Sequence, residues 1–137
     1  MNEINCISAT PVPDADRLDF LPTMFGTHLM MRGEALVFGW MKRLWNGYQG
    51  GYWSFYTLSN GGGYLALANV KVFQIDVEGN GYSGELSADA AGIVATLFAL
   101  CQLAAETEQE CIVVLYHALR DFAAEHAEAG LIFRAID

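Results

Sequence analysis

One stretch decides the fold: Asn46-Gly-Tyr-Gln-Gly-Gly-Tyr-Trp-Ser-Phe-Tyr-Thr-Leu-Ser-Asn-Gly-Gly-Gly-Tyr64, with six glycines and six aromatic residues in nineteen positions. Glycine lets the backbone reach positive φ, and aromatic side chains at alternate positions suit a pleated strand. The stretch therefore predicts a tight turn, a strand over 52–58, a glycine loop and a returning strand over 64–68. A stacking platform for nucleic-acid bases is the alternative, but such platforms need a positive groove. The net charge of −9 favours the hairpin, whose tyrosine-rich face is a candidate protein-contact surface.

Strand signals continue after this hairpin. Residues 70–77 are rich in β-branched side chains, and Asn80-Gly81 is a two-residue hairpin signal that leads into a strand over 82–86. The sequence thus predicts four consecutive short strands, which form an antiparallel meander.

Helical periodicity flanks the strands on both sides. Leu18, Leu21 and Phe25 lie on one face of the first predicted helix, and Ser87 is a good N-cap for the helix that follows the strands. Asp89 then falls in the first turn, where the helix dipole favours a negative charge. The predicted helices cover residues 15–25, 32–46, 88–105, 108–126 and 129–135.

The order of helices, strands and helices is that of an α+β fold. At 137 residues the chain is one domain. Residues 1–13 are predicted to be a loose leader, and residues 14–137 a single compact domain in which the meander packs against four to five helices. The uncharged stretch 90–105 is short and alanine-rich, which favours a buried core helix over a membrane span. No secretory signal is visible, so we expect a cytosolic protein and no membrane partner.

The acidic charge is concentrated in the second half of the chain. Residues 1–75 carry as many acids as bases, whereas residues 76–137 carry eleven acids and only Arg120 and Arg134. Such a surface repels nucleic acid, and direct DNA binding is not expected. A DNA mimic remains an alternative, which needs a clustered acidic stripe. The side chains available for such a stripe are Glu106, Glu108, Glu110, Asp121, Glu125 and Glu128.

Motifs for catalysis or cofactor binding are weak. The glycines of Gly79–Gly84 match a dinucleotide-binding fingerprint, but they fall in a predicted hairpin rather than at the start of a helix. His117 and Asp121 share a helical face without a third metal ligand. Glu85 and Asp89 flank a strand-to-helix junction, where paired carboxylates could perform acid–base chemistry. An exposed strand charge and a helix-dipole residue are the favoured explanation of the two, so no enzyme, metal or cofactor is expected.

Five blocks of sequence, in order, cover most of residues 32–137. They are Arg32–Met41, Tyr48–Gly61, Gly84–Leu100, Tyr116–Phe122 and Ile132–Asp137. Together these blocks resemble the ArdB/KlcA antirestriction family of plasmids and other mobile elements. That family is distinct from the elongated, strongly acidic antirestriction proteins that imitate DNA.

The resemblance implies a bacterial cytosolic inhibitor that protects incoming plasmid or phage DNA from type I restriction–modification systems. It implies contact with that machinery, directly or through a host factor, and it carries over no catalytic residues. We expect a monomer. The alternatives are an acidic DNA mimic at the restriction enzyme's DNA site, and a small-ligand-binding or hydrolytic enzyme that uses Glu85 and Asp89. The candidate interaction residues, chosen within the blocks, are Arg32, Gln49, Tyr52, Asn60, Glu85 and Asp89.

Overall fold

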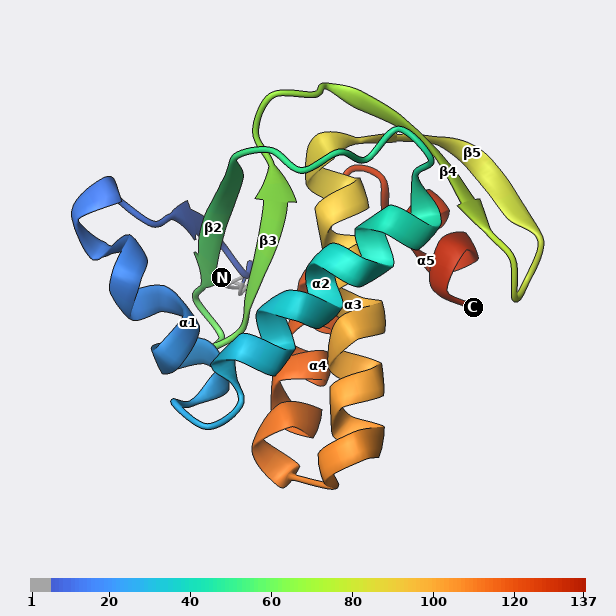
Figure 1. The fold of residues 1–137 in the computed structure, drawn as a ribbon. Coiled ribbons are helices and arrows are strands. Elements are labelled where there is room, and N and C mark those ends of the chain that lie inside the picture. The colour runs from blue at the N-terminus through green and yellow to red at the C-terminus, as the bar shows by residue number, and fades with distance from the viewer. Residues whose placement is uncertain (1–5) are drawn as a thin grey trace, which may run out of the picture.

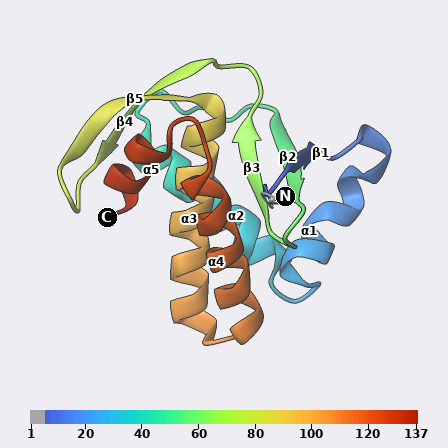
Figure 2. The same cartoon turned by 180° about the vertical axis from the view of Figure 1, so that it is seen from behind.

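A computed structural model describes residues 6–137, which form five helices and two small antiparallel sheets. In chain order the elements are β1 (Ala9–Pro11), the 3₁₀ turn η1 (Asp14–Asp16), α1 (Arg17–Phe25), α2 (Met30–Leu44), β2 (Trp53–Leu58), β3 (Gly63–Leu67), β4 (Val72–Val77), β5 (Tyr82–Ser87), α3 (Ala88–Thr107), α4 (Glu110–Ala124) and α5 (Ala129–Ile136). Helix α3 is central: α2 crosses it on one side (Figure 1), and α4 runs beside it on the other (Figure 2). The predicted α+β architecture is confirmed.

The first sheet has the strand order β1-β2-β3. The glycine- and aromatic-rich stretch forms the predicted hairpin, in which Trp53 pairs with Leu67. Strand β1 pairs with the free side of β2. A hydrogen bond of 2.8 Å from Val12 N to Phe55 O continues this pairing past Pro11 and Tyr56. The predicted loose leader over 1–13 therefore contains a paired strand, while its residues 1–5 lie outside the described part of the chain.

The four predicted strands do not form one meander, because β4 and β5 make a separate two-stranded sheet. Helix α3 occupies the edge of β3 that a fourth strand would need. Leu65 N on β3 donates to Thr96 Oγ1 on α3 at 3.3 Å. A Cβ atom on Gly92 would lie only 2.3 Å from Leu65 O. The helix backbone thus lies against the strand, and β4 pairs elsewhere.

The central helix is buried on nearly all sides, as its apolar sequence predicts. By length and composition α3 could cross a membrane, but most of its apolar window is buried inside the fold. The predicted cap is confirmed, because Ser87 Oγ accepts a hydrogen bond from Ala90 N at 3.1 Å. The central element is therefore a core helix.

Helix α1 differs from its prediction at one residue of the predicted face. Leu18 is 92% exposed, and the buried residues are Phe20 and Phe25. Residues 14–16 form a 3₁₀ turn, so the helix itself begins at Arg17 and its inner face is set by aromatic contacts. Phe20 stacks on Phe55 with ring centroids 4.7 Å apart. Of the predicted face, Phe25 is buried and Leu21 packs partly on the core, so only Leu18 departs from the prediction.

Candidate functional site

The six candidate residues do not form one site. Arg32 and Asp89 are held in two polar networks at opposite ends of α3, because Arg32 contacts Glu106 near the helix end and Asp89 lies in its first turn. Glu106 lies seventeen positions after Asp89 on α3. At a rise of 1.5 Å per residue, the two residues are about 25 Å apart along the helix axis.

The first network joins α2 to α3. Arg32 donates from Nε to Glu106 Oε1 at 3.0 Å and from Nη2 to Oε2 at 2.6 Å, and Gln102 Nε2 donates to the same carboxylate at 2.9 Å. These hydrogen bonds, chiefly those from Arg32, lower the pKa of Glu106 to about 2. The pair is partly exposed, so its contribution to stability is small. Arg32 was a candidate from the sequence, but its pairing with Glu106 and the bond from Gln102 to Glu106 were not predicted.

The same network fixes an aromatic side chain. Trp40 Nε1 donates to Gln102 Oε1 at 2.9 Å, and the Trp40 ring stacks on Phe98 with centroids 4.6 Å apart. The Arg43 guanidinium lies 4.5 Å from the centroid of the Trp40 ring, at cation–π distance. Trp40 is therefore held in a single orientation at the surface.

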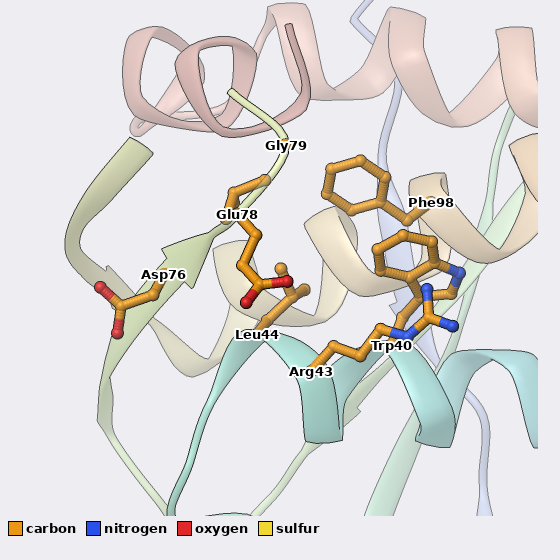
Figure 3. A pocket seen from close by; sticks show the side chains of 8 residues that line it. Trp40, Arg43, Leu44, Asp76, Glu78, Gly79 and Phe98 are labelled. Atoms are coloured by element: carbon orange, nitrogen blue, oxygen red, sulfur yellow. The ribbon is translucent and has the colours of Figure 1, made fainter. Parts of the chain in front are cut away.

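A groove of about 300 Å³ opens beside Trp40 (Figure 3). Its lining consists of Trp40, Arg43, Leu44, Asp76, Val77, Glu78, Gly79 and Phe98. Figure 3 shows the Glu78 side chain reaching toward Leu44 and Arg43, whereas Asp76 points away. Among residues 6–137, neither Arg43 nor Glu78 takes part in a salt bridge. The groove therefore brings aromatic rings, a cationic side chain and anionic side chains together at the surface.

The second network centres on Asp89. Tyr64 donates its hydroxyl proton to Asp89 Oδ1 at 2.7 Å, and His126 Nε2 lies 2.8 Å from Oδ2. Burial, followed by the bond to Asp89, raises the pKa of Tyr64, which keeps its hydroxyl protonated as a donor. The predicted position of Asp89 in the first turn of a helix is correct, but its two partners were not foreseen.

His126 ties the turn between α4 and α5 to the start of α3. Glu128 N donates to His126 Nδ1 at 2.9 Å, which leaves Nε2 as the protonated nitrogen of the neutral ring. The Glu128 carboxylate in turn accepts hydrogen bonds from the Ser87 amide, at 3.0 Å, and from the Ser87 hydroxyl. Both imidazole nitrogens are occupied, so His126 has none free to activate a nucleophile. These contacts of His126 and Glu128 hold the α4–α5 turn against the start of α3, and we call them the latch.

The carboxylate pair that would serve a hydrolytic enzyme does not form. Asp89 directs its two oxygens at Tyr64 and His126. Glu85 is exposed on β5, opposite Gln74 in the strand register. Within the described chain, no group of three histidine, cysteine, aspartate or glutamate side chains could hold a metal ion.

The remaining candidates are separate from these networks. Asn60 accepts from Gly62 N at 3.1 Å and donates to Ala118 O at 2.9 Å, so its polar group shapes the β2–β3 turn and joins it to α4. Tyr52 lies under the Arg17 guanidinium, 4.4 Å from its ring centroid, and remains about half exposed. Gln49 is exposed in the loop before β2.

Three of the six acidic side chains proposed for a stripe make contacts within the fold. Glu106 is paired with Arg32, and Glu128 with Ser87. Glu125 accepts a hydrogen bond from Ile7 N at 2.9 Å. Glu110 and Glu125 lie at opposite ends of α4, about 22 Å apart along a helix of that length. Several of these carboxylates are thus used in local structure rather than aligned like phosphates.

Comparison with known sequences identifies the class to which this compact α+β protein belongs. The profile of a family described as antirestriction protein matches residues 46–137, and the chain belongs to this family. The resemblance noted from the five blocks is confirmed.

Similar proteins extend the match to nearly the whole chain. Two Escherichia coli proteins named antirestriction protein KlcA are 58% identical over 135 residues and 60% identical over 137 residues. Each alignment covers 96% of this chain, and the two cover 95% and 94% of the respective relatives. A solved structure from work on the KlcA and ArdB proteins is 56% identical, with a TM-score of 0.91, and the match covers 100% of this chain and 99% of that one. For those proteins, antirestriction activity against type I DNA restriction systems is described in vivo but not in vitro.

Proposed function

We propose that this chain protects incoming DNA from type I restriction–modification systems inside the bacterial cell, and that it acts through protein contacts rather than by chemistry on a substrate. One observation carries the proposal: a full-length superposition, at a TM-score of 0.91 and 56% identity, on a protein with that activity in vivo. The two chains cover one another almost completely, so nearly every element of that solved chain has a counterpart here.

The difference between the activities in vivo and in vitro supports an indirect mechanism. An inhibitor that simply filled the enzyme's DNA site would act on the purified enzyme. Activity confined to cells instead points to a host component that is missing from the purified reaction. We therefore propose that the chain acts together with a host factor, and further that it does so as a monomer in the cytoplasm.

The layout of charge and chemistry supports protein contact over the two alternatives. A DNA mimic needs a continuous row of carboxylates, but Glu106 and Glu128 are already bonded to Arg32 and Ser87. A hydrolytic site needs a free base, but both oxygens of Asp89 are bonded within the fold.

The test is the plating efficiency of unmodified phage on cells that carry a type I system, with and without this chain. We expect the chain to raise plating toward the level of modified phage. The same cells with a type II system serve as the control, in which no protection is expected. Equal plating with and without the chain on the type I host would overturn the proposal.

A second assay separates indirect inhibition from DNA mimicry. Purified chain is added to a purified type I enzyme and its DNA substrate over a range of salt concentrations. The proposal predicts no inhibition, whereas a mimic competes with DNA in a salt-dependent manner. Inhibition by the pure chain alone would show that no host factor is required.

A further inference from the structure

The β4–β5 hairpin has a free edge whose direction follows from its hydrogen-bond pattern. Ala88 N donates to Lys71 O at 3.0 Å, and this pair extends the register that joins Val72 with Ser87. Hydrogen-bonded and non-hydrogen-bonded pairs alternate in an antiparallel ladder. The backbone groups of Gln74 and Asp76 therefore point away from β5.

The opposite edge of the hairpin confirms this alternation. Ser87 falls in a non-hydrogen-bonded pair, and its N–H does point outward, where it donates to Glu128 Oε1 at 3.0 Å. Among residues 6–137, no such acceptor is recorded for the N–H groups of Gln74 and Asp76. By contrast, the edge strand of the other sheet carries Pro11, which has no N–H and discourages a further strand.

The groove beside Trp40 reaches the end of this free edge, at Asp76 and Val77. One wall is formed by residues 76–79, and no residue of β5 contributes to the lining. The other wall is α2, and the Trp40–Phe98 stack lies on the groove floor (Figure 3). A segment placed in the groove would thus meet unpaired backbone donors on one side and an aromatic surface below.

We propose that an extended segment of a partner protein binds in this groove and adds to the free edge of β4 as a further strand. Its backbone would pair with Asp76, and alternate side chains would point to opposite faces. Apolar side chains on the inner face pack on Trp40, Phe98 and Leu44. Basic side chains pair with Glu78, since this half of the chain carries most of the negative charge. The inference rests on the proposed function and specifies its contact surface.

A matched pair of substitutions tests the edge itself. Asp76 and Ser83 face one another in the register, and Ser83 Oγ donates to Asp76 Oδ1 at 2.6 Å. Asp76→Pro and Ser83→Pro each remove that side-chain bond and one outward N–H, but only the first changes the edge beside the groove. Proline is tolerated where the N–H faces away from the ladder. Circular dichroism and thermal unfolding establish that both variants fold.

Binding is measured with a defined probe, the alternating peptide acetyl-(Leu-Lys)₃-amide, by following tryptophan fluorescence. We expect saturable binding to the native chain, and a loss of affinity of about tenfold in Asp76→Pro but not in Ser83→Pro, as for the loss of one hydrogen bond. The same peptide with methyl groups on alternate backbone nitrogens should bind at least about tenfold more weakly. Equal binding of both peptides, or no binding of either, would overturn the inference.

A second variant keeps the test valid if Asp76→Pro does not fold. Glu78→Lys changes only an exposed turn residue and should weaken probe binding, whereas Glu110→Lys, on a different part of the surface, should have a smaller effect. If Glu78→Lys and Glu110→Lys weaken probe binding equally, the groove is not the binding site.

The phage assay then separates the two proposals. If the native chain protects and Asp76→Pro does not, while Ser83→Pro does, both proposals stand. If Asp76→Pro protects as well as the native chain, the edge is not used and only the proposed function survives. If the native chain fails to protect, the proposed function fails, even where the probe still distinguishes the two edges.

Discussion

Tyr64 donates its hydroxyl proton to Asp89 at 2.7 Å and so joins β3 to the first turn of α3. The second oxygen of the same carboxylate contacts His126, which lies beyond the end of α4. One side chain thereby connects three parts of the chain that are far apart in sequence. Because Tyr64 is only 1% exposed, water cannot replace this bond without local opening.

The Tyr64 hydroxyl should contribute measurably to stability. Tyr64→Phe leaves the ring in place but removes the donor to Asp89, and we expect the free energy of unfolding to fall by about 1–2 kcal/mol. Tyr56→Phe is the control, because its ring stacks on Tyr64 at 4.8 Å and no hydrogen bond is recorded for its hydroxyl. Urea unfolding of both variants checks the prediction, which equal losses would contradict.

His126 should contribute more to stability than His117, which lies on α4. His126→Ala removes contacts to Asp89 and to the Glu128 amide, so we expect a loss of about 2 kcal/mol in unfolding free energy. His117 is exposed on α4, and His117→Ala should change stability by less than about 0.5 kcal/mol. Hydrogen exchange gives a second readout, since the Glu128 amide should exchange faster only in the first variant. An unchanged exchange rate there would contradict the latch.

The Arg32–Glu106 pair should affect stability in acid. The pKa of Glu106 is about 2 in the folded protein, against an ordinary value of 4.5. A lowered folded-state pKa stabilises the fold above the unfolded-state pKa, and this contribution is lost as the pH falls from about 4.5 toward 2. Glu106→Gln should therefore lose less stability than the native chain across this range.

The control for this prediction is Glu110→Gln, which replaces an exposed glutamate without a recorded ion pair in residues 6–137. Thermal unfolding at intervals between pH 5 and pH 2.5 compares the three proteins, and added salt should reduce their differences. Parallel acid profiles for the native chain and Glu106→Gln would show that the ion pair does not form in solution.

Substitution of alanine for two helical glycines, Gly92 and Gly39, should change the free energy of unfolding in opposite directions. A Cβ atom on Gly92 would lie 2.3 Å from Leu65 O, so Gly92→Ala must separate α3 from β3 and should cost more than about 2 kcal/mol. A Cβ atom on Gly39 of α2 would meet nothing within 4 Å. Gly39→Ala should raise stability by about 0.5–1 kcal/mol, because alanine favours the helix. Thermal unfolding distinguishes them, and similar shifts for both would contradict the observed contact between α3 and β3.

Local patterns were sufficient to predict most elements. The alternation around Trp53 and Phe55 predicts a strand over 52–58, and the structure forms β2 there, with both rings buried. The place of Ser87 before an apolar helix predicts an N-cap, and Ser87 caps α3 by accepting a hydrogen bond from Ala90 N. Both features depend on residues that are close in sequence, so the sequence alone could reveal them.

Contacts between distant segments could not be predicted in this way. The separation of the two sheets depends on Thr96 and Gly92 meeting Leu65, which lies 31 residues before Thr96. The partners of Asp89 likewise come from a strand and from a turn 37 residues away. His126 falls at the end of the helix predicted over 108–126, and that position does not reveal that its ring contacts a carboxylate.

The most direct test of the central claim is the plating efficiency of unmodified phage on a type I host that expresses the native chain, compared with the same phage already carrying the host's modification. The account predicts that the chain closes most of the gap between the two phages in cells, and that the purified chain leaves the purified enzyme active. A gap that stays as wide as in cells without the chain would contradict it.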